Sequence, residues 1–190
     1  VPAAIDAVVA TINPNNPVLA ELLATGLTPE MGAAIWLNNE VTTWGQVAGT
    51  TDTTPINVYT RSDASGAAEA IRQDTLGIGF NNIAFSYDLA TGLQVEGLVV
   101  LPLDLNGDGQ ISADENFYGT REEINRAVAE RRYPYPPARL LFLVTKGPPS
   151  PAVADFMRWM LTEGQAFVNE AGFVGLSEQS IAEGLVLLEE

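Results

Sequence analysis

The feature that most limits the possible folds is an alternation of strand-like and helix-like segments along the chain. Residues 56–60, INVYT, have the β-branched and aromatic content of a strand, and residues 64–73, ASGAAEAIRQ, follow with a helical pattern. Such alternation favours an α/β fold, in which helices cover a sheet. Further strands are predicted over residues 5–12, 76–87, 95–103 and 140–145, and further helices over 18–25, 28–37, 121–131, 150–172 and from 177 onward.

Composition narrows the class of function. The chain has 190 residues, 46% of them hydrophobic, and its 24 acidic and 9 basic residues give a net charge of −15. That charge argues against nucleic-acid binding, which needs clusters of Lys and Arg. The absence of His removes His-based catalysis and imidazole metal sites, so an enzyme would depend on carboxylates, Tyr or Lys146. We therefore expect a protein that is not an enzyme and has no nucleic-acid partner.

The apolar segments are short. No run approaches the roughly 18 residues that a membrane-spanning helix needs, so the chain is not expected to cross a membrane. The first residue is Val rather than Met, which indicates a mature, trimmed or fragmentary chain. The absence of Cys leaves the redox compartment undetermined.

Residues 104–115, DLNGDGQISADE, match every fixed position of the EF-hand calcium loop. In that loop, side-chain oxygens at alternate positions converge on a hard cation, a glycine permits a sharp bend, and a backbone carbonyl and a bidentate Glu complete the shell. The spacing therefore predicts a calcium site. The predicted ligands are Asp104, Asn106, Asp108, the carbonyl of Gln110, Ser112 and Glu115.

Two features limit this interpretation. Residues 98–103, LVVLPL, are typical of a strand rather than of an incoming EF-hand helix, so we expect a lone structural site instead of a sensor. Residues 106–109, NGDG, could also form an Asx-rich turn without any metal. Asp114 is expected to be an exposed charge rather than a ligand.

A second candidate site lies in residues 60–67, TRSDASGA, where a strand leads through small residues into a helix. The free N–H groups and positive dipole end of a helix suit a tetrahedral anion, and the guanidinium of Arg61 can donate to two oxygens at once. Arg61 and Arg72 are the only basic residues before Arg121. The alternative is an ordinary helix cap beside a surface Arg–Asp ion pair.

These residues carry a family resemblance. Residues 58–67, VYTRSDASGA, resemble the Arg-Ser-Asp-Gly-Ser-Gly-Thr segment of the periplasmic phosphate-binding proteins of ABC transporters, which belong to the type 2 periplasmic binding proteins. The similarity extends to residues 8–19 (VVATINPNNPVL), 42–47 (TTWGQV), 77–80 (GIGF), 135–140 (YPPARL), 162–165 (TEGQ) and 171–173 (AGF).

The resemblance implies a mixed sheet flanked by helices and arranged in two lobes. By it, residues 1–132 form the second lobe, with the calcium loop, and residues 133–190 form the C-terminal part of the first lobe. The Pro-rich connector at 134–137 marks the boundary. The N-terminal part of the first lobe, which contributes the opposing half of the ligand cleft in the family, has no counterpart here.

The resemblance also assigns roles to the second candidate site. Arg61, Ser65, Gly66 and the backbone of Ala67 would contact the oxyanion, while Asp63 would orient Arg61. Ala67 stands where the family commonly has Thr, so one hydroxyl donor is missing although its N–H remains.

The implied function is binding of phosphate outside the cytoplasm, in the periplasm or at the cell surface, and its transfer to a membrane ABC permease. A lipid anchor before trimming would fit the same location. Sulfate, molybdate or tungstate stay open as ligands. The main alternative is a calcium-stabilised cell-surface interaction domain, and a carboxylate-based hydrolase is a weaker one because no acidic pair stands out.

Overall fold

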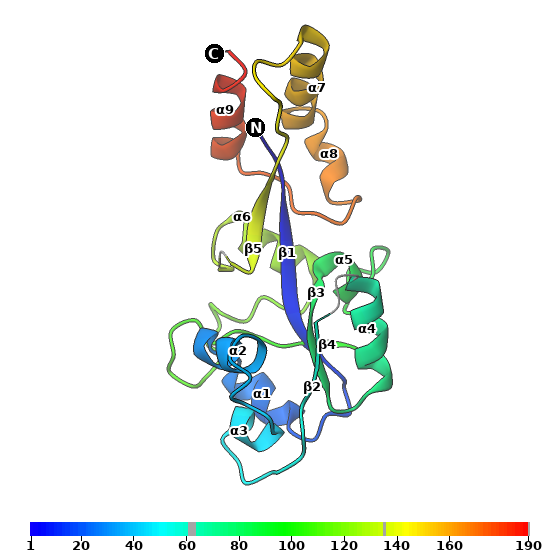
Figure 1. Cartoon of the computed structure of the whole chain (residues 1–190), viewed down its shortest axis with the longest axis vertical. Coiled ribbons are helices and arrows are strands. Elements are labelled where there is room, and N and C mark those ends of the chain that lie inside the picture. Colours follow the sequence, from blue (N-terminus) through cyan, green and yellow to red (C-terminus); the bar gives the residue numbers. More distant parts are fainter. Residues whose placement is uncertain (61–63, 135, 190) are drawn as a thin grey trace. The chain divides into compact units, whose positions relative to one another are not determined.

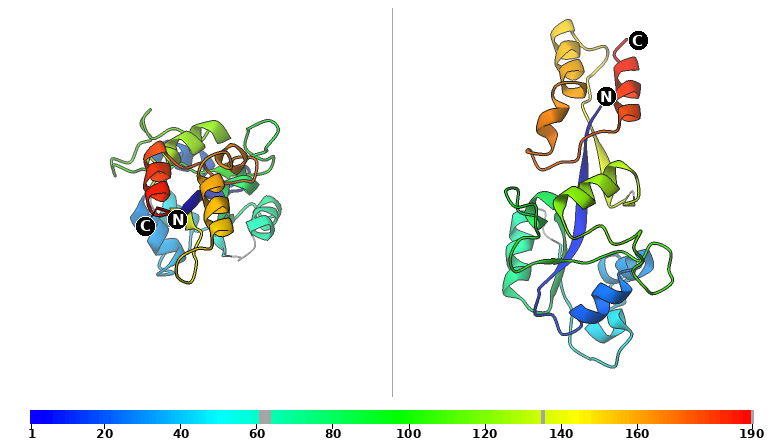
Figure 2. Two further views of the ribbon diagram at one scale, coloured as in Figure 1. Left: turned by 90° about the horizontal axis from the view of Figure 1, so that it is seen from above. Right: turned by 180° about the vertical axis from the view of Figure 1, so that it is seen from behind.

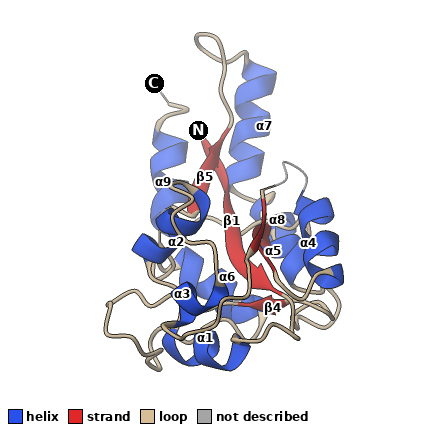
Figure 3. Cartoon of the chain, turned by 60° about the horizontal axis from the view of Figure 1, so that its bottom comes forward, coloured by secondary structure: helices blue, strands red, loops and turns tan. Residues whose placement is uncertain are grey.

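The computed structural model describes residues 1–60, 64–134 and 136–189 and contains both helices and strands, as the α/β prediction requires (Figure 3). Contacts divide the chain into two compact units. Unit 2 comprises Val8–Ile124, and unit 1 comprises Val1–Ala7 together with Asn125–Glu190. The first strand, β1 (Pro2–Ile12), contributes residues to both units.

Unit 2 is built on a mixed sheet with the strand order β2-β3-β1-β4. Strands β2 (Asn57–Tyr59) and β3 (Gly77–Asn82) run parallel, whereas β1 is antiparallel to both β3 and β4 (Val99–Val100). The parallel pair requires a crossover, which the helix α4 (Ala64–Gln73) supplies. This part of the sheet therefore contains a β-α-β unit, as the alternation of patterns predicts.

One face of this sheet is covered by α1 (Leu19–Thr25), α2 (Pro29–Trp36) and α3 (Trp44–Ala48) (Figure 1). Successive side chains of a strand point to opposite faces, so alternate residues of β1 and β3 contribute to this core. The buried residues that form it are Ala10, Ile12, Val18, Leu22, Leu27, Ile35, Trp44, Ile78 and Leu101.

The opposite face of the sheet packs against α4. Ile71 of this helix is fully buried in a small cluster with Ala68 and Leu98. A short helix, α5 (Ile83–Ser86), follows β3 directly and contacts α4. Unit 2 is therefore a three-layer α/β/α arrangement.

Unit 1 has a smaller sheet, in which residues 2–7 of β1 pair antiparallel with β5 (Ala138–Phe142). Arg139 lies opposite Asp6 in this pair, and its guanidinium donates to the Asp6 carboxylate at 2.7 and 3.0 Å. The helices of this unit are α7 (Pro151–Leu161), α8 (Gln165–Val168) and α9 (Glu178–Val186), and α6 (Arg121–Ala129) begins in unit 2 and ends in unit 1 (Figure 2).

Two of the predicted strands are wrong over part of their length. The strand predicted over 76–87 ends at Asn82, because the Asn82 side chain accepts a hydrogen bond from the N–H of Ala84 at 2.7 Å and caps α5. The strand predicted over 95–103 is reduced to β4, since Gly97 bends the chain with a φ of +85° and Pro102 has no N–H to donate.

Helix predictions differ from the structure in two further places. The helix predicted over 150–172 breaks at Thr162, which leaves helical geometry and donates its hydroxyl to the Arg158 carbonyl at 2.8 Å, so α7 and α8 are separate. The helix α3 was not predicted. Its signal is a capping box in which Gln46 Oε1 accepts from the N–H of Thr43 at 3.0 Å.

Among the described helices, none combines the length and the apolar character that crossing a bilayer requires.

Candidate functional site

The β2–α4–β3 unit positions the predicted anion site at the start of α4. Gly66 and Ala67 lie in the first turn of this ten-residue helix, and Ala67 is fully buried while Gly66 is half-buried. Arg61 and Asp63 fall outside the described residues, as does the side chain of Ser65. The structure therefore places the helix start at the carboxyl end of β2 without testing the contacts predicted for these three side chains.

The first turn of α4 supplies backbone donors. The first four N–H groups of an α-helix have no partner within the helix, and they lie at the positive end of its dipole. Gly66 adds no side chain to this turn, so the backbone remains open to close approach. The arrangement is chemically suited to an anion.

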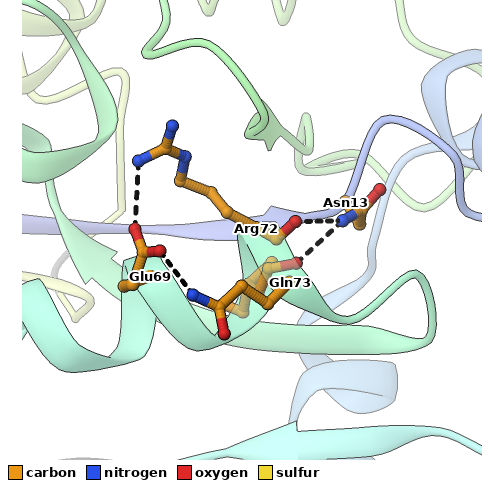
Figure 4. A network of polar contacts seen from close by, with 5 residues as sticks. Asn13, Glu69, Arg72 and Gln73 are labelled. Carbon is orange, nitrogen blue, oxygen red and sulfur yellow. Dashed lines mark hydrogen bonds and ion pairs between the residues drawn. The ribbon is translucent and has the colours of Figure 1, made fainter.

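The other end of α4 is held by Asn13, which follows β1. Its Nδ2 donates to the carbonyls of Ile71 and Arg72 at 2.9 and 3.0 Å and so satisfies two of the last carbonyls of the helix (Figure 4). Arg72 in turn donates to Glu69 at 3.0 Å, on the exposed surface of the helix. The sequence places Asn13 in a turn, but its contact with residues 58 positions away was not predicted.

Asp74, which follows α4, binds β2 and the turn that precedes β3. Its carboxylate accepts hydrogen bonds from Asn57 Nδ2 at 2.7 Å, from the Tyr59 hydroxyl at 2.9 Å and from the N–H of Leu76 at 2.9 Å. Partial burial raises the pKa of this carboxyl, but the three donors outweigh that effect and hold its pKa below the ordinary value of 3.8. The ionised carboxylate of Asp74 thus stabilises the β2–α4–β3 unit by accepting these three hydrogen bonds.

Close packing under α4 depends on glycine. A Cβ added to Gly79 would lie 2.7 Å from the Tyr59 carbonyl oxygen and 3.1 Å from Ile71 Cδ1. Two residues further along β3, Asn81 is fully buried on the same face and donates to the Thr11 hydroxyl, which itself donates to the Gly79 carbonyl. Asn81 Oδ1 has no hydrogen-bond partner among the described residues. Neither role was predicted from the sequence.

In the loop predicted to bind calcium, the carboxylates of Asp104 and Glu115 accept hydrogen bonds from other residues of the same loop. Asp104 Oδ1 and Oδ2 accept from the N–H groups of Gly107 and Gly109 at 2.7 and 2.9 Å. Glu115 Oε1 accepts from the N–H groups of Leu105 and Asn106, and its Oε2 accepts from the hydroxyl of Ser112 at 2.7 Å. The bonds from Ser112 are the main reason that the pKa of Glu115 is lowered.

The predicted ligands differ in exposure. Asp104 and Glu115 are buried, with exposed fractions of 1% and 6%, whereas Asn106, Asp108, Gln110 and Ser112 are exposed. Gly109 has a φ of +78°, the bend that the motif requires at this position. Within the described residues, however, no three acidic side chains are grouped closely enough to hold a metal ion. Calcium binding therefore stays a prediction.

The loop is anchored to α1 and to the residues that directly follow this helix. The N–H of Ile111 donates to the Ala24 carbonyl, and the N–H of Asp104 donates to the Leu27 carbonyl, both at 3.0 Å. Gly26, with a φ of +72°, makes this contact possible, because an added Cβ would lie 2.4 Å from Ile111 Cδ1. The loop is therefore packed against the rest of unit 2.

Unit 2 also has a shallow depression of about 380 Å³ between α4 and α5. Arg72, Glu69 and Asp88 lie on its rim with apolar residues that include Phe85 and Leu89. On α4 its described lining consists of Ala68, Glu69 and Arg72, and does not include Gly66 or Ala67.

Comparison with known proteins identifies the family. Residues 1–163 match the family model described as PBP superfamily domain. No curated protein matches the chain. Among solved structures, a possible phosphate binding protein from Planctomyces limnophilus superposes with a TM-score of 0.66 at 17% identity, covering 100% of this chain and 72% of that one.

Two further structures are similar. An ABC-type phosphate transport receptor from Vibrio cholerae has a TM-score of 0.64 at 16% identity, over 92% of this chain and 71% of that one. A putative phosphate ABC transporter substrate-binding protein from Clostridium perfringens, with bound phosphate, has a TM-score of 0.59 at 17% identity, over 93% and 71%. These structures establish the type 2 periplasmic-binding-protein fold, and the match over residues 1–163 shows that the chain belongs to the PBP superfamily.

Proposed function

We propose that this protein binds phosphate or a related tetrahedral oxyanion outside the cytoplasm and delivers it to the permease of an ABC transporter. The observation that supports the proposal is that residues 60–67, TRSDASGA, connect β2 to α4 along the sequence of a chain that belongs to the PBP superfamily. Similar solved structures are named as phosphate-binding or phosphate-transport proteins. The proposed role is binding without chemical conversion of the ligand.

Each proposed contact has a chemical reason. The guanidinium of Arg61 would donate to two oxygens of the anion, and the N–H groups of Gly66 and Ala67 would donate to the others. Asp63 would hold the guanidinium in place, and the Ser65 hydroxyl would add a neutral donor. The net charge of −15 is screened beyond about 8 Å at physiological ionic strength, so these local donors decide the affinity.

Calorimetric titration of the full natural polypeptide with phosphate, sulfate, molybdate and tungstate tests the proposal. We expect saturable heat of binding with one of these oxyanions, and competition experiments then rank the four. If none of them produces heat, the protein is not an oxyanion carrier, and the calcium-stabilised interaction domain becomes the better explanation.

We also propose that residues 104–115 bind one calcium ion as a structural element of unit 2. Every proposed ligand is an oxygen, which suits a hard cation. The buried carboxylates of Asp104 and Glu115 lie at the two ends of the loop, and the position of Gly109 permits the required bend. When bound, the ion would supply positive charge to the loop and tie it more firmly to α1.

Thermal unfolding tests the calcium site. Calcium should raise the melting temperature of the parent chain relative to the same chain in a chelator, because an ion that binds only the folded state stabilises it. Glu115→Gln should abolish this difference by removing the bidentate ligand, while the neighbouring control Asp114→Asn should retain it. Equal melting temperatures of the parent chain in calcium and in chelator would rule the site out.

A further inference from the structure

The loop of residues 104–115 contains two sequence pairs that are prone to spontaneous rearrangement. Asn106 and Gly107 form the one Asn-Gly pair of the sequence, and Asp108 and Gly109 form its one Asp-Gly pair. The backbone nitrogen that follows an Asn or Asp can attack the side-chain carbonyl carbon of that residue. A glycine nitrogen attacks most readily because no Cβ crowds its approach, and every other Asn of the sequence precedes a residue with a Cβ.

The reaction at Asn106 needs only water as a co-reactant. The backbone nitrogen of Gly107 loses its proton and bonds to Asn106 Cγ, while the bond from Cγ to Nδ2 breaks and the side-chain nitrogen leaves with that proton as ammonia. Water then opens the five-membered imide. Opening at Cγ leaves an aspartate, whereas opening at the main-chain carbonyl leaves an isoaspartate, whose main chain is one methylene longer. At Asp108 the same route loses and regains one water.

A single carboxylate binds both attacking nitrogens. The N–H of Gly107 donates to Asp104 Oδ1 at 2.7 Å, and the N–H of Gly109 donates to Asp104 Oδ2 at 2.9 Å. A nitrogen in this position retains its proton, because losing it would break the hydrogen bond and place two negative charges side by side. Asp104 is buried, so water competes little for its two oxygens.

The two side chains that would be attacked are also hydrogen-bonded. Asn106 Oδ1 accepts from the N–H of Asp108 at 2.8 Å, and Asp108 Oδ1 accepts from the N–H of Gln110 at 2.9 Å, so each forms an Asx turn. Gly107 and Gly109 have φ values of +74° and +78°, which disfavour any residue with a side chain. The loop therefore needs glycine at the two positions where glycine makes the chain reactive.

We propose that Asn106 is a site of spontaneous deamidation and that the carboxylate of Asp104 slows the reaction while the loop is folded. Residues 106–109 are exposed, so the protection comes from hydrogen bonds and not from exclusion of water. An isoaspartate at position 106 would shift the two glycine N–H groups away from Asp104 and so open the loop. This inference goes beyond oxyanion transport and does not require calcium.

Incubation at neutral pH and physiological temperature in a chelator tests the proposal without any contribution from calcium. Peptide mass spectrometry measures the mass increase at Asn106 over time, and electron-transfer fragmentation detects isoaspartate at Asp108. The parent chain is followed in its native state and in guanidinium chloride. The variant Asp104→Asn removes the charge and turns one acceptor oxygen into a donor, and Asp114→Asn is the matched control, since it removes an exposed carboxylate of the same loop.

Deamidation of Asn106 should be at least about tenfold slower in the native parent chain than in the denatured one, since the folded loop reacts only after local opening. Folded Asp104→Asn, verified by circular dichroism, should react at least about tenfold faster than the parent at Asn106 and also faster at Asp108, because the carboxylate that holds both nitrogens is gone. Asp114→Asn should match the parent at both positions.

Equal rates in the native and denatured parent chain would overturn the proposal. A folded Asp104→Asn that reacts as slowly as the parent would also overturn it, and so would an Asp114→Asn variant that reacts as fast as Asp104→Asn. If Asp104→Asn does not fold, the comparison of the native with the denatured parent chain still decides whether the folded loop protects Asn106.

Discussion

Single polar residues connect distant parts of unit 2. Asn13 satisfies the last carbonyls of α4, and Asp74 gathers donors from β2 and from the turn that precedes β3. A buried or half-buried polar group stabilises a fold only when its partners are in place. These two residues therefore hold the C-terminal end of α4 and the turn before β3. The candidate anion site lies at the other end of α4.

Asp74→Asn tests the role of this carboxylate. At pH 7 the substitution should lower the free energy of unfolding by about 1 kcal/mol, because an amide cannot accept from all three donors and one N–H₂ group then faces another donor. Chemical denaturation at a series of pH values measures the effect, with Asp155→Asn as the control, since the Asp155–Arg158 pair is an exposed i,i+3 ion pair.

The lowered pKa of Asp74 determines how its contribution to the free energy of unfolding changes with pH. The pKa of Asp74 is lower in the folded state than its ordinary value of 3.8, so the carboxylate stabilises the fold above that pH, and the contribution is lost as the pH falls through the folded-state value. The difference between the parent chain and Asp74→Asn should therefore shrink below about pH 3.8. A difference that stays constant down to pH 2 would contradict the assigned role.

Local chemistry made some of these residues predictable. The turn at Asn13 follows from the Asn-Pro-Asn-Asn sequence, and the N–H of Asn15 does donate to Asn13 Oδ1 at 2.9 Å. The second contact of Asn13, with the end of α4, depends on how the chain folds back, which no local pattern contains. For the same reason no local pattern predicts the contacts of Asp74 and Asn81, which depend on the packing of α4 against the sheet.

At the scale of the elements, helix ends were easier to predict than strand ends. The capping box of α6 is present as predicted, with the N–H of Thr120 donating to Glu123 at 2.8 Å and the N–H of Glu123 donating back to Thr120 at 3.2 Å. Thr28 likewise accepts from the N–H of Met31 at 3.1 Å and begins α2. A cap is encoded by residues three positions apart, so sequence spacing reveals it.

Strand lengths depend on partners that are distant in sequence. The apolar run after Gly77 continues beyond Asn82, but pairing with β1 stops at Asn82 and the next four residues form α5. Likewise β5 begins at Ala138, earlier than predicted, because Ala138 pairs with Ala7. Alternating apolar residues therefore predicted that the strands exist, but not where pairing stops.

Glycine substitutions test the packing of α4 on the sheet. Gly79→Ala should destabilise unit 2 by about 1–3 kcal/mol, because the new methyl group would overlap the Tyr59 carbonyl and crowd Ile71. Gly32→Ala is the control, since Gly32 lies inside α2 with only the Trp36 ring near its Cβ position, at 3.9 Å or more, and should stabilise the chain by about 0.5–1 kcal/mol.

Denaturation of both variants at pH 7 measures these effects. A lower free energy of unfolding for Gly79→Ala together with a higher one for Gly32→Ala would support the close approach of α4, β2 and β3. A neutral or stabilising Gly79→Ala would show that the layers are less tightly packed than the structure indicates.

At the scale of the whole molecule, the α/β class and the family were both predictable, and the match to the PBP superfamily confirms them. Their signals are distributed along the chain, from the alternation of elements to several separate segments. The contacts of the candidate anion site stay a prediction, because Arg61, Asp63 and the Ser65 side chain lie outside the described residues. Oxyanion binding is therefore the claim on which the functional interpretation depends.

The most direct measurement compares two arginine variants of the full polypeptide in calorimetric titrations with the oxyanion that the parent protein binds. Arg61→Ala should weaken binding by at least about tenfold, because it removes a charge-assisted pair of hydrogen bonds. Arg72→Ala, which removes an equal charge from the exposed end of α4, should leave the dissociation constant unchanged. Equal affinities for the parent protein and Arg61→Ala would contradict the account.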